Sequence, residues 1–201
     1  MVALAPFAAS AGPMAPISGA QMQGAHVVSW GRVEVDVTLK IAFTVLTDYD
    51  RMAQFLPGML ESAVVARDGN AVIIDQSADE GAYLFVQRVD ARLAIDESPP
   101  DRLTIRALSG SFREFEGSYV LTRKSGRTMV EYRARFLPDF FMPPMIGIQT
   151  VQRSLERHLG ALAQEMLRRS AGGQVPAEGQ APASKGPDAR TIAPARKGEG
   201  S

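Results

Sequence analysis

Four polar side chains interrupt the apolar faces of predicted strands, where they could bind an oxygen or nitrogen atom. They are Gln76, Gln87, Tyr119 and Tyr132. A buried amide that lacks a hydrogen-bond partner costs roughly 1–3 kcal/mol. Each glutamine is therefore expected to bind either a neighbouring side chain or a ligand carbonyl, and the tyrosine hydroxyls are candidates for orienting a polar head. The chemistry that these residues offer is hydrogen bonding.

The sequence does not contain a recognisable catalytic pair or metal-binding motif. His26 and His158 are its only histidines, and it has no cysteine. His158 lies at the edge of an apolar helix stripe, where a lone histidine is expected to be structural, and Asp48 and Asp50 are expected to cap a short helix. We assign no catalytic residue, expect neither a metal nor a cofactor, and favour binding over catalysis, although an enzyme remains an alternative.

The composition fits one folded domain with tails. Of 201 residues, 45% are hydrophobic, and the 22 basic residues balance 22 acidic ones. A neutral chain has no global field that would draw it to nucleic acid, so no nucleic-acid partner is expected. Absence of cysteine leaves the compartment open, and the oligomeric state is unknown.

Both ends of the chain are rich in small residues, proline and glycine. Residues 1–25 are expected to be a disordered tail or the remnant of an export signal, and residues 171–201 a second disordered tail. The compartment is unknown: a soluble protein is expected, either cytoplasmic or, if an export signal starts upstream, periplasmic. The folded domain is expected to span residues 26–170.

Within this domain, turn residues separate seven runs with a strand-like alternation. One side of each long run is apolar and the other charged, which is typical of an antiparallel sheet with one covered face. Short loops between the runs favour the same pairing. The runs cover residues 32–39, 59–67, 71–77, 83–95, 103–108, 113–123 and 128–137.

A long amphipathic helix is expected to cover this sheet. Pro143 and Pro144 suit a helix start, and an apolar stripe continues to about Ser170. Two short helical segments follow the first strand, one over residues 41–49 and a second that ends at residues 55–58. The pattern predicts an α+β fold in which a curved seven-stranded antiparallel sheet wraps on the long C-terminal helix and encloses an apolar cavity.

The link between the last strand and the long helix is unusually apolar for a loop. It is expected to act as a pocket gate or a foothold on a membrane, or else to be a plug packed under the helix start. A turn near residue 56 is a second candidate gate. The candidate gate residues are Phe55, Leu56, Phe140, Phe141, Met142 and Met145.

Three features together resemble a known superfamily. They are the segments 45–49 with 55–57, the segment Gly110-Ser111-Phe112-Arg113-Glu114-Phe115-Glu116-Gly117, and the long final helix. Over about residues 30–170 they look like the polyketide cyclase/dehydrase and coenzyme Q-binding branch of the START-like (SRPBCC) superfamily. The resemblance implies a helix-grip fold with a hydrophobic tunnel. It also implies functions that range from quinone and lipid carriage to aromatase/cyclase activity and toxin-like protein interaction.

The leading hypothesis is binding or carriage of a hydrophobic small molecule: a lipid, an isoprenoid quinone or a polyketide-like compound. The alternatives are a polyketide cyclase or dehydratase and a toxin-like protein-interaction module. A peripheral membrane contact is a further possibility. The candidate ligand-binding residues are Tyr83, Phe85, Gln87, Phe115, Tyr119, Tyr132, Phe136, Val151, Leu155 and Leu159.

Overall fold

The computed structural model describes residues 14–82 and 85–172, which form one eight-stranded antiparallel sheet and one long helix, α3. The strand order is β1-β2-β8-β7-β6-β5-β4-β3. The strands are β1 (Ile17–Gln23), β2 (His26–Val35), β3 (Met59–Asp68), β4 (Ala71–Ala82), β5 (Phe85–Ser98), β6 (Arg102–Gly110), β7 (Phe112–Lys124) and β8 (Arg127–Pro138). The helices are α1 (Leu39–Leu46), the 3-10 turn η1 (Tyr49–Arg51), α2 (Met52–Phe55) and α3 (Pro144–Gly172).

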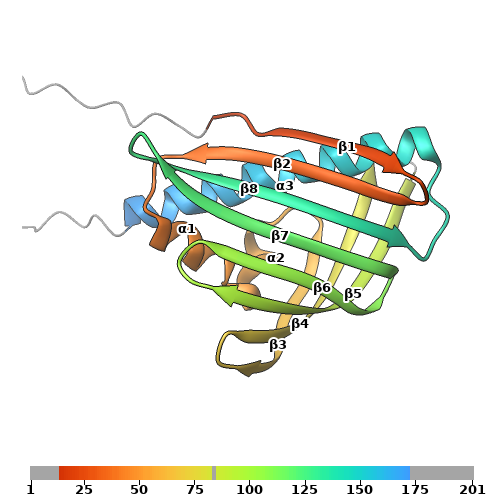
Figure 1. Ribbon diagram of the computed structural model, residues 1–201, viewed down its shortest axis with the longest axis horizontal. Helices are drawn as coiled ribbons and strands as arrows, with labels where there is room; N and C mark the ends of the chain where they lie inside the picture. The colour runs from red at the N-terminus through yellow and green to blue at the C-terminus, as the bar shows by residue number, and fades with distance from the viewer. Residues whose placement is uncertain (1–13, 83–84, 173–201) are drawn as a thin grey trace, which may run out of the picture.

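The sheet curves around the helices, so that one of its faces is covered (Figure 1). Helix α3 passes behind β2 and β8 in this view, and α1 and α2 close the space beside it. Thr38 starts α1 because its Oγ1 accepts a hydrogen bond from the Ile41 amide at 3.3 Å. This arrangement is the expected helix-grip fold.

The structure corrects the expected strand count from seven to eight. The extra strand is β1, which falls within the tail that was expected to be disordered. It joins β2 through a turn at Gly24, whose φ of +63° favours glycine. Gly19 of β1 pairs with Trp30, and a Cβ at Gly19 would lie only 2.7 Å from the indole ring. The absence of a side chain at Gly19 therefore lets the Trp30 indole lie against β1.

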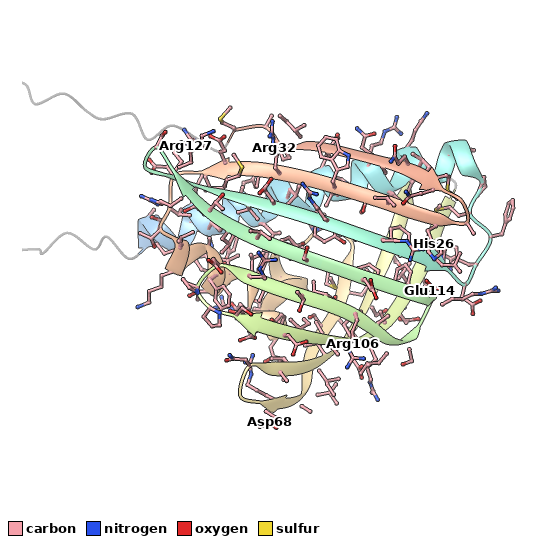
Figure 2. All side chains as sticks on the ribbon, in the orientation of Figure 1. His26, Arg32, Asp68, Arg106, Glu114 and Arg127 are labelled. Carbon is pink, nitrogen blue, oxygen red and sulfur yellow. The ribbon has the colours of Figure 1, made fainter. Side chains whose placement is uncertain are left out.

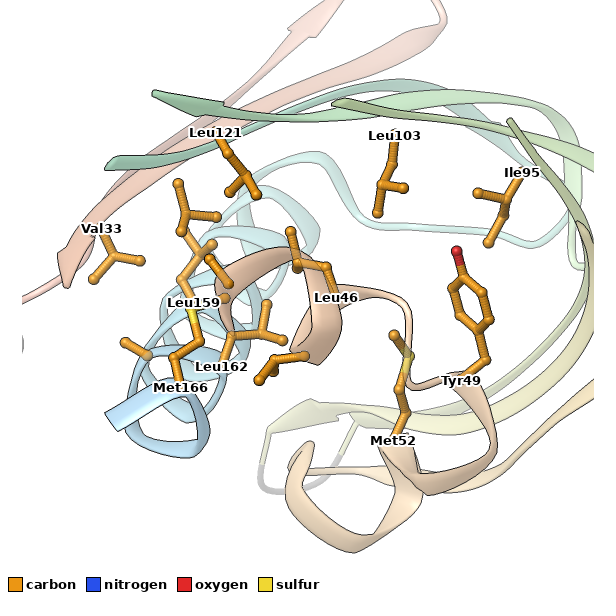
Figure 3. Packing of buried hydrophobic residues seen from close by; sticks show 14 of the residues in the cluster. Val33, Leu46, Tyr49, Met52, Ile95, Leu103, Leu121, Leu159, Leu162 and Met166 are labelled. Carbon is orange, nitrogen blue, oxygen red and sulfur yellow. The ribbon is translucent and has the colours of Figure 1, made fainter. Parts of the chain in front are cut away.

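The C-terminal half of α3 packs closely against the sheet and α1, and Leu162 lies where this packing borders the cavity described below. Leu159 and Met166 are 0% exposed, and Figure 3 shows them with Leu162 close to Val33 and Leu46. Gly31 of β2 makes this approach possible, because a Cβ there would lie 2.6 Å from Leu159 Cδ1 and 3.2 Å from Leu155 Cδ2. This end of the molecule is a filled core.

Ion pairs fasten the same half of α3 to the segment after α1. Arg169 donates to Asp48 at 2.6 Å and to Glu165 at 2.7 Å, and its guanidinium lies 5.7 Å from the Phe55 ring centroid. The expected capping role of Asp48 is wrong, since its side chain makes no cap hydrogen bond. Asp50 likewise binds elsewhere, accepting a hydrogen bond from the Val64 amide at 2.8 Å.

The outer face of the sheet carries charges of both signs, among them Arg32, Arg106 and Glu114 (Figure 2). Several are paired: Arg92 lies 2.7 Å from Asp75, for example. Within the described ranges, no helix is long and apolar enough to cross a membrane. The same residues hold no group of three or more side chains suited to a metal ion.

Candidate functional site: an apolar cavity under the first half of the long helix

A cavity of about 400 Å³ lies between the inner face of the sheet and the N-terminal half of α3. Every layer of the fold contributes to its wall. The sheet supplies side chains from β2 to β8, and α1, η1 and α2 close one side. The described lining residues include Leu46, Tyr49, Met52, Ile74, Leu93, Ile95, Leu103, Ile105, Phe112, Tyr119, Tyr132, Val151, Ser154, Leu155 and Leu162.

Strand register explains why space remains here. Three rows of inner-face residues cross β2, β8 and β7, and the middle row pairs Ser29 with Ala134 and Ala134 with Gly117. These side chains are too short to reach α3, whereas the rows on either side carry aromatic rings. The Phe115 ring leans into part of this space, since a Cβ at Gly117 would lie 3.2 Å from it.

The aromatic rings of the wall form two groups. Phe112, Phe115 and Phe136 have ring centroids 5.3–6.0 Å apart, and Tyr119 and Tyr132 have centroids 4.9 Å apart at an interplanar angle of 48°. Such tilted and edge contacts hold rings in defined orientations. The cavity therefore has rigid aromatic surfaces on its sheet side.

A buried carboxylate orients one tyrosine of the wall. Tyr49 donates its hydroxyl to Glu97 at 3.0 Å, and Arg67 binds both Glu97 oxygens at 3.0 and 3.1 Å. Burial, followed by the nearby Glu97 charge, raises the pKa of Tyr49 well above its ordinary value. Tyr49 is therefore a neutral phenol at physiological pH, and its proton is committed to Glu97.

The two glutamines are bound by protein groups. Gln76 Nε2 donates to Ser62 Oγ at 3.1 Å and to Met52 Sδ at 3.3 Å. Gln87 is exposed at the cavity rim and donates to the Arg88 carbonyl at 2.9 Å. Each amide was expected to bind either a neighbouring protein group or a ligand carbonyl. In the structure both bind neighbouring protein groups.

The loop after β8 forms one end of the cavity and is strongly exposed. Phe141 is 87% exposed and Ile146 is 49% exposed, yet both line the cavity. The loop is tied down by an Arg113–Asp139 ion pair at 2.6 Å. Met142 lies over Gly147, where any Cβ would collide with its side chain. We call this end of the cavity the mouth; Phe141 and Ile146 are exposed there, whereas Phe140 and Met142 are half-buried.

Most predicted site residues meet at this cavity. Gln87, Phe115, Tyr119, Tyr132, Phe136, Val151 and Leu155 line it, as do the gate candidates Leu56, Phe140, Phe141 and Met142. Leu159 and Phe55 do not: Leu159 is packed against Gly31, and Phe55 lies under Arg169. Tyr83 and the side chains of Phe85 and Met145 lie outside the described residues. The ligand-binding and gating roles themselves stay predictions.

Several lining residues were missed from sequence. Ile95 and Leu103 lie on inner faces of predicted strands, and their alternation could have found them. Met52, Ser154 and His158 had no such signal. His158 Nε2 lies 2.9 Å from the Pro57 carbonyl, to which it donates, so this histidine connects α3 to the turn after α2.

Several solved structures share this architecture. A STAR-related lipid transfer protein from Xanthomonas axonopodis superposes with a TM-score of 0.65 at 15% identity, covering 76% of this chain and 94% of that one. The Zhui aromatase/cyclase from Streptomyces sp. R1128 gives 0.64 at 15% identity, covering 74% and 98%. A START superfamily protein from Mycobacterium smegmatis gives 0.61 at 14%, covering 71% and 98%. At these identities the likeness shows a shared fold.

The sequence itself carries the family assignment. A search of curated proteins found no significant match. The sequence profile of the polyketide cyclase/dehydrase and lipid transport family, however, matches residues 35–163, which is more than half of the chain. That range begins at the end of β2 and extends into the filled half of α3, so it includes most of the cavity wall. The chain belongs to the polyketide cyclase/dehydrase and lipid transport family.

Proposed function

We propose that the protein binds one uncharged, largely apolar small molecule in the cavity under α3. The observation that carries the proposal is a space of about 400 Å³ lined mainly by aliphatic and aromatic side chains. Moving apolar surface from water into such a site contributes about 25 cal/mol per Å². Sites of about 300–1,000 Å³ are usual for drug-sized ligands.

The lining restricts the ligand class. Among the described lining residues there is no lysine, arginine, aspartate or glutamate. Burying an ionised ligand group without a counter-charge is strongly unfavourable. The volume lies near the lower end of the usual range, so a two-chain phospholipid with a charged headgroup is a poor fit. A single-chain lipid, a quinone head or a polyketide-like ring system fits better.

Binding is favoured over cyclase catalysis by the state of the polar groups. General acid–base catalysis needs a group that can exchange a proton with the substrate. The Tyr49 proton is held by Glu97, and His158 Nε2 donates to a backbone carbonyl. The aromatase/cyclase relative supports the alternative at the level of fold, and a cyclisation assay on a polyketide-like chain would distinguish the two.

The test is titration of the uncharged fluorescent probe N-phenyl-1-naphthylamine, together with native mass spectrometry of the purified protein. Probe fluorescence should rise on binding, and Val151→Phe, which places a ring in the cavity, should weaken binding at least tenfold. Val65→Phe is the matched control, because Val65 is half exposed on β3, outside the cavity wall. Equal affinity for all three proteins would contradict the proposal.

We also propose that the exposed mouth contacts a lipid surface, from which an apolar ligand can enter directly. Phe141 and Ile146 are both exposed and continuous with the cavity wall. Flotation with phosphatidylcholine vesicles should show association that the Phe141→Ser/Ile146→Ser double variant loses. Val65→Ser, which removes an exposed apolar side chain elsewhere, should keep it. Absence of wild-type flotation would remove this part of the proposal.

A further inference from the structure

Resting on the proposed binding function, we infer that the Tyr119 hydroxyl donates a hydrogen bond to an uncharged oxygen acceptor on the ligand, such as a ketone. The inference concerns which molecules the cavity prefers, and it assigns this preference to one hydroxyl on the sheet side of the cavity.

The position of Tyr119 exposes its side chain to the cavity alone. It lies on β7, paired with Tyr132 on β8 and Leu103 on β6, which also line the cavity. Its ring is held at 4.9 Å from the Tyr132 ring. The side chain is half-buried, and because it points to the inner face, its accessible part faces the cavity interior.

The hydroxyl of Tyr119 differs from that of Tyr49 in its partners. Tyr49 donates to Glu97 at 3.0 Å, whereas Tyr119 makes no hydrogen bond to any residue that the structure describes. The hydroxyl is not among the fully buried side-chain atoms without a partner in the part of the chain that the structure describes, so it is accessible from the cavity. Most polar groups inside folded proteins are hydrogen-bonded, and one left unpaired by a bound ligand is unfavourable. A ligand oxygen in the cavity would supply the missing partner.

The hydroxyl acts as a donor in this contact. Burial alone raises the pKa of Tyr119 above its ordinary value, so the phenol keeps its proton at physiological pH. A carbonyl oxygen accepts such a bond and carries no charge, in keeping with a wall whose described residues include no ionised carboxylate or ammonium group. A hydrocarbon of the same shape would leave the hydroxyl unpaired.

The experiment compares 9-fluorenone with fluorene, which have the same three-ring frame and differ by a carbonyl in place of a methylene. Each displaces N-phenyl-1-naphthylamine from wild-type protein and from Tyr119→Phe, a change that removes one oxygen and keeps the ring. The variant should bind fluorenone about 2–10-fold more weakly, the worth of one net hydrogen bond, and should bind fluorene as the wild type does.

Two further variants locate the effect. Tyr132→Phe removes a hydroxyl from the adjacent ring, and Ser29→Ala removes one from the neighbouring row of the wall. Loss of fluorenone affinity in either of these, but not in Tyr119→Phe, overturns the inference. So does an equal change for fluorene and fluorenone in Tyr119→Phe.

Failure of the inference is distinct from failure of the proposed function. If the wild type binds fluorene and the naphthylamine probe but Tyr119→Phe leaves fluorenone affinity unchanged, the binding function stands and the role of Tyr119 is wrong. If neither fluorene, fluorenone nor the probe binds the wild type, the proposed function fails and the inference fails with it. Thermal unfolding of each variant checks that it folds.

Discussion

The two halves of α3 perform different tasks although they belong to one continuous helix. From Leu159 onward the inward-facing side chains, among them Ala163 and Met166, are buried, Leu162 also borders the cavity, and Arg169 fastens this half to Asp48. Residues between Ile146 and His158 face the cavity, and Ile146 remains half exposed. Figure 3 shows Leu159 and Met166 on the inner side of α3, and shows the cavity-lining residues Leu103 and Tyr49 pointing into the space that the sheet encloses.

A stable domain can keep a hollow when another part of the same helix is well packed. A 29-residue helix is roughly 43 Å long and stiff, so fixing one half also positions the other. The filled half supplies the burial that holds the helix in place. The hollow half can then leave space beneath it without losing its position, and its side chains are free to be selected for a ligand.

The largest expected effect is on stability, when a side chain is truncated in each half of α3. Met166→Ala removes a fully buried side chain from the filled half and should lower the free energy of unfolding by about 2–5 kcal/mol. Ile146→Ala, at the mouth, should change it by less than about 1 kcal/mol. Urea unfolding followed by circular dichroism measures both. Similar losses for the two variants would break the comparison.

The next largest effect is on stability when a phenylalanine ring is added to the filled core or to the cavity. Val33→Phe overpacks the filled core and should cost about 1–3 kcal/mol of stability. Val151→Phe enters existing space, so it should leave the unfolding midpoint nearly unchanged while weakening probe binding. A stable Val33→Phe protein would mean that the filled half also contains usable space.

The smallest expected effect is a pH dependence of stability that arises from Glu165 in the filled half. Ion pairs with Arg168 and Arg169 lower the pKa of Glu165 from 4.5 to about 2. A lowered pKa stabilises the folded state above the ordinary pKa, and this contribution is lost as the pH falls from 4.5 toward 2. At neutral pH the free energy of unfolding of the wild type should therefore be about 1–2 kcal/mol larger than that of Glu165→Gln. This figure allows for solvent screening at the exposed Arg168.

The stability difference between wild type and Glu165→Gln should close by about pH 2, as measured by thermal unfolding at stepped pH. Glu116→Gln, on the exposed outer face of β7, serves as the control. A difference that stays constant across this range would show that Glu165 contributes through shape rather than charge. Ligand affinity at neutral pH should be unchanged in Glu165→Gln, because Glu165 is not among the lining residues.

Much of the sheet and the long helix could be predicted, because alternation with period two and a stripe with helical spacing both leave a direct mark on the sequence. The strand β1 could not, because Ile17–Gln23 is short, small and polar and depends on pairing with β2. A signal was present in the Gly24 turn before the apolar start of β2.

The candidate site was predicted in its chemistry but not in its extent. Leu155 and Leu159 occupy the same helix stripe, and periodicity cannot show that one borders the cavity while the other packs on Gly31. Phe55 carries the same ambiguity, which only Arg169 resolves. Such assignments depend on how closely two elements approach, and that distance is set by residues far away in the chain.

Gly31 gives this last point a wider consequence. It acts as a spacer of minimal thickness between β2 and α3, at the border of the filled core, and a methyl group there would meet Leu159 and Leu155. A larger residue at position 31 would push α3 away from β2. This would change the depth of the cavity without altering any of its aromatic side chains. Relatives that accept ligands of different size could therefore diverge at a position no ligand reaches.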